Sequence, residues 1–294
     1  MTDRGCLGAP ARPPARPWLA AHASRLAALA PLPPGARLDA LNAWARAGRV
    51  ASGSGRPLRF VADGPDEGAA RGPHEARVAY EARVFDDGEV STRIEGRGAR
   101  HDLYNALAWL AWPRTKAWLN ALHAGALAGA ARAGPRGPLR DAATLFDENG
   151  ALWVGTDPAL EDALRAFDWR ALFVERRVAL VAAVRVHVFG HALLEKLDAP
   201  FKGITAHAWP LRLPADAPPD ALDAALAASL QAGLVGALAA GTSASRAFCP
   251  LPVMGLPGWC EGNADPAFYN DATVFRPGRR RPDRAHDTET RWRS

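Results

Sequence analysis

Residues 101–124 read HDLYNALAWLAWPRTKAWLNALHA, and the rest of the chain is interpreted outward from this stretch. Its Trp, Leu and Ala residues are dense enough to be buried. Pro113 divides it into two expected helices, 101–112 and 113–131, because proline suits the first turn of a helix. Burying polar groups without partners costs roughly 1–3 kcal/mol each. We therefore expect the polar residues of this stretch to face partners or a cavity: His101, Asp102, Asn105, Lys116, Asn120 and His123.

Two polar stripes are expected on these helices. On the second helix Lys116, Asn120 and His123 share one face, and on the first His101 and Asn105 are one turn apart. Facing one cleft, they would supply a general base, an amide that orients a carbonyl and a cation for an anionic group. The alternative is a solvated face at Lys116 with asparagines that cap or cross-link helices, as on many surface helices. The sequence leaves both interpretations open.

The β pattern is strongest over residues 77–97, where RVAYEARVF and EVSTRIE flank an Asp-Asp-Gly sequence at 86–88. An Asp-Gly pair between alternating runs predicts a hairpin. Residues 141–153 (DAATLFDENGALW) predict a second hairpin for the same reason. Further strands are expected at 57–62, 180–188 and 204–213, the second of them central in its sheet.

Helical patterns complete the expected elements. They cover residues 18–30, 38–47, 158–177 with a break near Asp168, 190–197, and 219–240 with leucine at every fourth position. Residues 248–276 are rich in Pro and Gly but also aromatic, which predicts an ordered, irregular wrap over the core.

Because strands and helices interleave without repeated strand–helix–strand units, the expected class is α+β. We expect a single domain over residues 18–277, in which antiparallel hairpins pack against several helices. The Pro/Arg-rich residues 1–17 and the basic residues 278–294 are expected to be disordered tails.

The positive charge of the chain lies at its ends. The net charge is +5, of which residues 276–294 contribute +4 and residues 1–18 contribute +2, leaving −1 for the rest. This distribution predicts weak, salt-sensitive association with nucleic acid and no specific nucleic-acid site.

Composition also limits the cellular setting. The three cysteines form no CxxC pair, which argues against a disulfide framework or a thiolate zinc site and favours the reducing cytoplasm. The uncharged residues 224–245 have the spacing of an amphipathic helix instead of a membrane span, so no membrane partner is expected.

A divalent metal is the cofactor that the sequence suggests. His191 and Glu195 are one helical turn apart in GHALLEK, a spacing that suits a metal and equally suits a helix hydrogen bond. Asp141, Asp147 and Glu148 could also surround an ion, although Asp-Glu-Asn-Gly is ordinary turn chemistry. We take His191 and Glu195 as the candidate ligands. The sequence holds no GxGxxG, Walker or GxSxG motif.

Five blocks, in order, resemble the proteobacterial family known as domain of unknown function 3025 (DUF3025). They are HDLYNALAWLAWPRTKAWLNALH at 101–123, RDAATLFDENG at 140–150, FGHALLEKL at 189–197, PLPVMGLPGW at 250–259 and FYNDATVFRP at 268–277. The resemblance covers nearly the whole chain between the tails. That family has no established activity, so the resemblance implies no catalytic residues.

Three functions follow as hypotheses. The first is a hydrolase-like enzyme in which His101 or His123 is the base and Lys116 stabilises developing negative charge. Its full set of candidate catalytic residues is His101, Asp102, Asn105, Lys116, Asn120, His123 and Asp147. The second is a non-catalytic module that binds a protein or small ligand through a tryptophan-rich surface. The third is nucleic-acid association through the arginine-rich tails.

Overall fold

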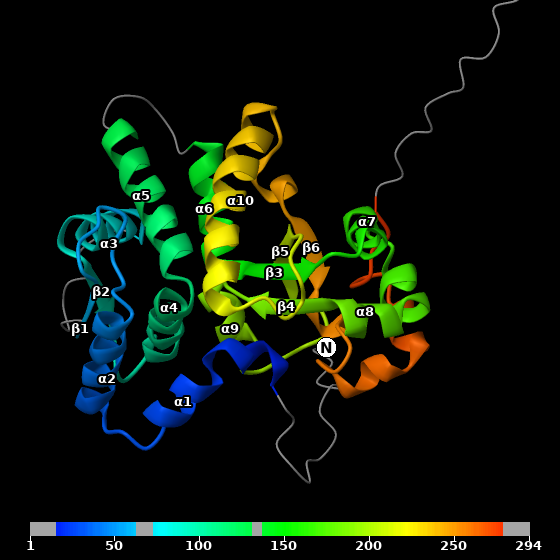
Figure 1. Cartoon of the computed structure of the whole chain (residues 1–294), viewed down its shortest axis with the longest axis horizontal. Helices are drawn as coiled ribbons and strands as arrows, with labels where there is room; N and C mark the ends of the chain where they lie inside the picture. The colour runs from blue at the N-terminus through cyan, green and yellow to red at the C-terminus, as the bar shows by residue number, and fades with distance from the viewer. Residues whose placement is uncertain (1–15, 63–72, 131–136, 279–294) are drawn as a thin grey trace, which may run out of the picture.

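The computed structural model describes residues 16–62, 73–130 and 137–278 (Figure 1). Within these ranges the predicted α+β class is confirmed, since helices surround one sheet of four strands and one of two. The tails predicted to be disordered fall almost wholly outside the described residues. Their disorder, and the predicted single domain over residues 18–277, stay predictions.

The larger sheet has a core on each face. Its strands are ordered β4 (Val184–Val188), β3 (Gly150–Gly155), β5 (Thr205–Leu211) and β6 (Cys249–Pro252). β3 runs parallel to β5 and antiparallel to β4, and β5 runs antiparallel to β6. All of β3 is buried, because Ala151 and Trp153 join one apolar cluster while Leu152 and Val154 join the other. Alternation along the strand thus divides its side chains between two layers.

The Leu152 side of the sheet packs against α5 (Pro113–Ala130), α6 (Pro138–Asn149) and α10 (Pro219–Ala239). The leucine stripe predicted for α10 is confirmed, and its buried members are Leu222, Leu226, Leu230 and Leu234. Among the described helices, α10 alone is long and apolar enough to cross a membrane. Its leucine stripe lies against α5, α6 and β5.

The other apolar cluster joins the Trp153 side of the sheet to helices from both halves of the chain. η1 (Pro17–His22) and α9 (His191–Lys196) contact β4, and α4 (Ala99–Ala111) contacts α9. In Figure 1, α7 (Pro158–Ala166) and α8 (Arg177–Ala183) lie at one end of the molecule.

The smaller sheet lies at the other end of the view, beside α3 (Pro73–Asp87) (Figure 1). It pairs β1 (Arg59–Ala62) with β2 (Glu89–Thr92) in parallel, and α3 lies between them in the chain. α1 (Ala23–Leu29) and α2 (Pro34–Ala47) precede β1. Asn42 fastens α2 to β1, because its amide bonds both the N–H and the carbonyl of Phe60.

Both predicted hairpins are wrong, and for the same reason. In the first predicted hairpin, the run RVAYEARVF forms the end of α3 instead of a strand. Gly88 ends this helix with a φ of 73°, and its N–H donates to the Val84 carbonyl. The second begins as α6, and the Gly150 N–H donates to the Phe146 carbonyl before β3 starts. Glycine is favoured just past a helix end as well as in hairpin turns, so a local Asp-Gly or Asn-Gly signal fits both.

A third expectation is wrong in part. Of the predicted strand 180–188, residues to 183 form α8, and the strand that remains, β4, is at the edge of the sheet instead of its centre. The expected helices at α4, α5, α7 and α9 and the strands at β1 and β5 are confirmed. The break near Asp168 is also confirmed, because α7 ends at Ala166 and the next helical turn, η2 (Ala171–Glu175), has π geometry.

The predicted ordered wrap is confirmed as well. It comprises η3 (Ala244–Ala247), β6, η4 (Val253–Gly255), η5 (Glu261–Ala264) and η6 (Pro266–Asn270). The buried Asn263 amide donates to the carbonyls of Met254 and Leu256, at 2.8 and 2.6 Å, and Arg177 donates to the Asn263 side-chain oxygen. These bonds satisfy carbonyls of the irregular backbone that follows β6 and lies outside the sheet.

Candidate functional site

A cavity of about 410 Å³ lies where α3, β2, α4, α6 and α9 meet. Every residue that lines it carries a polar or charged side chain: Tyr80, Glu81, Ser91, Arg93, His101, Asp102, Asn105, Asp147, Glu148 and His191. Small-molecule sites are usually lined mostly by apolar groups. This cavity is therefore suited to a hydrophilic occupant.

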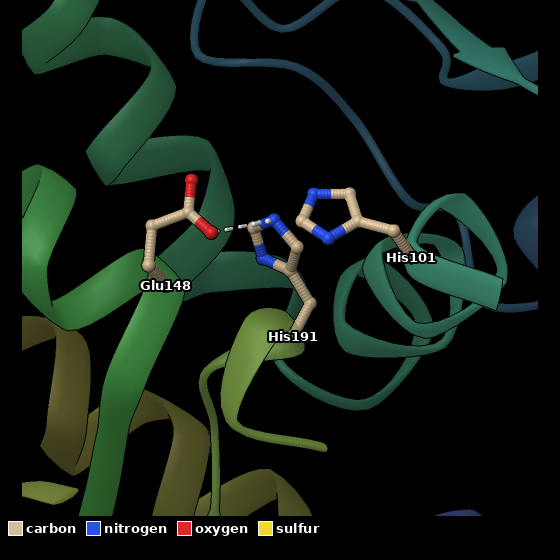
Figure 2. Close-up of side chains that lie close together, drawn as sticks. All are labelled: His101, Glu148 and His191. Carbon is tan, nitrogen blue, oxygen red and sulfur yellow. Dashed lines mark ion pairs between the residues drawn. The ribbon is translucent and has the colours of Figure 1, made fainter. Parts of the chain in front are cut away.

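Three side chains converge at this cavity from three different helices. His101 comes from α4, Glu148 from α6 and His191 from α9, and Figure 2 shows them pointing toward one another. One nitrogen or oxygen atom from each lies within 4.8 Å of the others. His191 Nε2 is 3.4 Å from a Glu148 carboxylate oxygen, and the two imidazole rings are 4.5 Å apart at their centroids.

This donor set fits a divalent metal ion. Two imidazoles and one carboxylate occur in catalytic zinc sites and in iron(II) sites, where further positions stay open to water or substrate. Ligand atoms about 2.1 Å from a tetrahedral ion lie about 3.4 Å apart. The His191–Glu148 pair already has this spacing, so only His101 must move closer, by up to about 1.4 Å.

A second carboxylate orients His101. The Glu195 Oε2 atom lies 3.0 Å from His101 Nδ1. A carboxylate can only accept, so His101 donates through Nδ1 and, in the neutral ring, keeps its lone pair on Nε2. Carboxylates that accept from the outer nitrogen of a metal-binding histidine fix its tautomer and orientation.

The end of α6 and the start of α9 are in close contact, which explains why Glu148 and His191 meet. Gly190 precedes His191, and a Cβ atom at this position would overlap the Glu148 carbonyl and the Asn149 backbone nitrogen. Gly190 also donates its N–H to the Gly150 carbonyl at 2.9 Å. A glycine is thus required for the two helix ends to approach this closely.

Behind the cluster is a buried ion pair. Lys116 Nζ lies 2.6 Å from Asp147 Oδ1 and over the Trp109 ring, and both charged side chains are at most 8% exposed. Burial alone would raise the pKa of Asp147, but the adjacent Lys116 ammonium, with His191, holds the pKa below its usual range. Asp147 Oδ2 is in turn 4.0 Å from His191 Nδ1.

His191 is a neutral imidazole in this setting. Burial lowers its pKa to about 3, and the Lys116 ammonium and His101 act in the same direction. A histidine binds a metal through a nitrogen that carries no proton. A neutral imidazole has one such nitrogen, so His191 can act as a ligand.

The loop after β2 is fastened to α4 by a carboxylate. Asp102 accepts two bonds from the Arg93 guanidinium, at 2.7 and 3.0 Å, and one from the Arg93 backbone N–H at 2.8 Å. A bidentate arginine–carboxylate pair fixes geometry as well as charge. Asp102 thereby holds this wall of the cavity in place.

The structure brings most of the predicted catalytic residues together. His101, Asp102, Asn105 and Asp147 line the cavity, as does the predicted metal ligand His191. Lys116 contacts Asp147 directly behind them, so it is not on a solvated face. The other predicted residues have different places: Asn120 bonds Glu81 and the Gly53 N–H, His123 is buried outside the cavity lining, and Glu195 contacts His101 instead of His191.

Five residues of the lining were not among the candidates. Tyr80, Glu81, Ser91 and Arg93 belong to the run interpreted as a hairpin, where no reason existed to place them beside α4. Glu148 is one of three acids that the sequence allows around an ion, but its Asp-Glu-Asn-Gly sequence favours a turn. A helical interpretation of residues 138–149 would have placed Glu148 at the carboxyl end of a helix, one residue after Asp147.

Comparison with known proteins places the chain in a family without assigning an activity. Neither the curated proteins nor the solved structures include a match to this chain. The model of a family described as "Protein of unknown function (DUF3025)" matches residues 58–279. That range contains every residue that lines the cavity. The chain belongs to the DUF3025 family.

Proposed function

We propose that this protein is a metal-dependent hydrolase whose ion is held by His101, Glu148 and His191. The observation that carries the proposal is the convergence of these three donors at a polar cavity. A divalent ion there would lower the pKa of a bound water and polarise a substrate oxygen. The protein supplies the ligands, the orientation of His101 by Glu195 and a polar space beside them.

Hydrolysis is favoured over redox chemistry by the lining of the cavity. Two histidines and one carboxylate also suit iron(II) oxygenases, in which the hydrophobicity of the surrounding shell controls solvent access. Here all ten lining residues are polar or charged, so water has ready access to the ion. Water is the nucleophile that hydrolysis requires.

The metal site is tested by zinc binding to the full chain. Protein purified without chelator is dialysed against zinc chloride, and bound zinc is measured by elemental mass spectrometry. One zinc per chain is expected, and His101→Ala, Glu148→Ala and His191→Ala should each weaken binding at least tenfold. His207→Gln is the control, because His207 lies on β5 and does not line the cavity.

The reaction class is tested on the zinc-loaded chain with a panel of small esters and amides. Turnover should disappear on chelation and return with zinc. Wild-type binding below 0.2 zinc per chain, or turnover that persists in His191→Ala, would contradict the proposal.

A binding module is the weaker alternative. That hypothesis requires exposed tryptophans that anchor a partner. Trp109 and Trp112, however, are each only 2% exposed. Trp118 is half-buried. Buried aromatic side chains cannot anchor a partner, so this stretch supports a core function instead.

A further inference from the structure

The buried polar network beside the candidate metal site has a defined hydrogen-bond direction. Lys116 Nζ lies 3.0 Å from the Asn105 side chain. An ammonium group can only donate, so the Asn105 atom that faces Lys116 must be the carbonyl oxygen. The Asn105 amide nitrogen then faces Tyr80 and donates to its hydroxyl oxygen at 2.8 Å.

This direction determines where the Tyr80 proton goes. The hydroxyl oxygen accepts from Asn105, so its own hydrogen must point to another acceptor. Among the residues whose side chains the structure describes (16–62, 80–125 and 137–278), no acceptor for the Tyr80 hydrogen is found. Tyr80 also lines the cavity that contains His101, Glu148 and His191. The network therefore presents an O–H donor to the space beside the three candidate ligands.

The donor is kept protonated by its surroundings. Burial raises the pKa of Tyr80, and the negative charge of Glu81 raises it further. Chains of hydrogen bonds that begin at a cation polarise each successive group, which strengthens the final donor. Here the cation is Lys116. It donates to Asn105, and Asn105 donates to Tyr80.

The charges around the cavity indicate the kind of oxygen that would accept this bond. Four of the lining residues are carboxylic acids and one is an arginine, which is itself paired with Asp102. Lys116 behind Asp147, Arg93 and a divalent ion together offset these four carboxylates, so the loaded site has no excess positive charge to attract an anionic substrate. An uncharged carbonyl oxygen needs no such charge, and it becomes a stronger acceptor as it gains negative charge in acyl transfer.

We propose that the Tyr80 hydroxyl is a catalytic hydrogen-bond donor to the carbonyl oxygen of the substrate, a small, polar, uncharged ester or amide. The inference rests on the proposed metal-dependent hydrolase. In it, Tyr80 binds the oxygen that acquires negative charge while the metal site supplies the water. Loss of one such donor in other acyl-transfer enzymes costs about 10²–10³ in turnover.

The test uses acetamide as the probe, because it is small and uncharged and offers an amide carbonyl oxygen beside a metal site. The full chain is loaded with cobalt(II), and probe binding is followed by visible absorption. Tyr80→Phe removes only the hydroxyl and is expected to raise the Kd of the probe about tenfold, as loss of one good hydrogen bond does. Cobalt affinity should not change. Tyr104→Phe is the matched control, since the Tyr104 hydroxyl bonds Asp198 and does not line the cavity.

Asn105→Asp tests the direction of the network. A carboxylate at this position would accept from Lys116 and also from the Tyr80 O–H, which turns that proton away from the cavity. The probe should bind about as weakly as to Tyr80→Phe, and the double variant should be no weaker than either single one. Additive losses would overturn the assigned direction.

The remaining outcomes are distinct. If wild type and Tyr80→Phe bind the probe with equal Kd while both hold cobalt, the role of Tyr80 is overturned and the metal site stands. If the wild type binds no cobalt, the proposed function is overturned and this inference with it. If Tyr80→Phe binds the probe more weakly than the wild type but binds cobalt equally well, and Tyr104→Phe binds both as the wild type does, the inference is supported.

Discussion

At the scale of single residues, the buried Lys116–Asp147 ion pair connects the candidate site to the stability of the fold. Both charges are buried, and each is compensated mainly by the other. Removing one partner of such a pair costs about 3–5 kcal/mol, because the other charge stays buried without compensation. Lys116→Met should therefore lower the free energy of unfolding by about that amount, measured by urea denaturation with chelator present.

Two further variants complete this comparison. Lys116→Met with Asp147→Leu should cost much less than the sum of the single changes, since no lone charge remains. Arg170→Met breaks the exposed Arg170–Glu175 pair and should cost less than about 1 kcal/mol. Equal losses in Lys116→Met and Arg170→Met would contradict the assigned burial.

His22 should make the fold sensitive to acid. It is fully buried at the end of η1, and burial, aided by the nearby Arg25, lowers its pKa to about 4. A histidine in an unfolded chain has a pKa near 6.5. Between about pH 4 and pH 6.5, His22 is therefore protonated in the unfolded state and neutral in the folded state. The free energy of unfolding is therefore unaffected by the protonation of His22 above about pH 6.5, and it decreases as the pH falls from 6.5 toward 4.

Replacing the imidazole tests this. Between pH 7 and pH 5, His22 should account for a loss of about 2 kcal/mol in the free energy of unfolding. His22→Phe keeps an aromatic ring at this position without the titrating group. The free energy of unfolding of this variant should therefore fall by about 2 kcal/mol less over this interval than that of the wild type. The check is urea denaturation of both proteins at the two pH values in chelator. Parallel losses would show that His22 is not responsible.

At the scale of elements, the sequence was informative about helix interiors and misleading at helix ends. α4, α5 and α10 were predicted from apolar periodicity, and their packing keeps that periodicity. α3 was misinterpreted because alternating Val and Tyr residues satisfy a strand pattern, although Tyr80 and Val84 are also one helical turn apart. Local propensity could not decide between the two, since the decision came from the contacts of α3 with α5 and β2.

The α6–α9 contact connects the fold to the site. Gly190→Ala would force a methyl group into the backbone at residues 148–149, so α9 must shift away from α6. Overpacking of this kind costs about 1–3 kcal/mol. The shift should also separate His191 from Glu148 and weaken zinc binding in the dialysis assay. Gly125→Ala is the control, because a Cβ there meets no atom within 4 Å. Unchanged zinc affinity in Gly190→Ala would show that the helix contact does not set the ligand spacing.

At the scale of the whole molecule, the convergence of the site depended on contacts that a linear sequence does not encode. His101, Asp147 and His191 could be singled out as polar residues in apolar segments. Their meeting depends on α9 packing against both α4 and α6, which lie far from it in the chain. Glu148 could not be distinguished from a turn residue until α6 was seen to extend to Asn149.

The charge distribution gives a prediction at the same scale. Residues 276–294 carry +4 of the net +5, so nucleic-acid association should come from this tail. Binding to a fluorescent single-stranded oligonucleotide should be weak, fall steeply between 50 and 200 mM salt and disappear on deletion of residues 278–294. Sequence-specific binding that survives the deletion would contradict this prediction.

The central claim is that a divalent ion binds between α4, α6 and α9. It is tested most directly by an anomalous difference map from crystals of the full chain grown with zinc, with data collected on both sides of the zinc edge. The account predicts one strong peak within about 2.2 Å of His101 Nε2, His191 Nε2 and a Glu148 carboxylate oxygen. A zinc-loaded crystal with these three side chains ordered and no peak between them would contradict it.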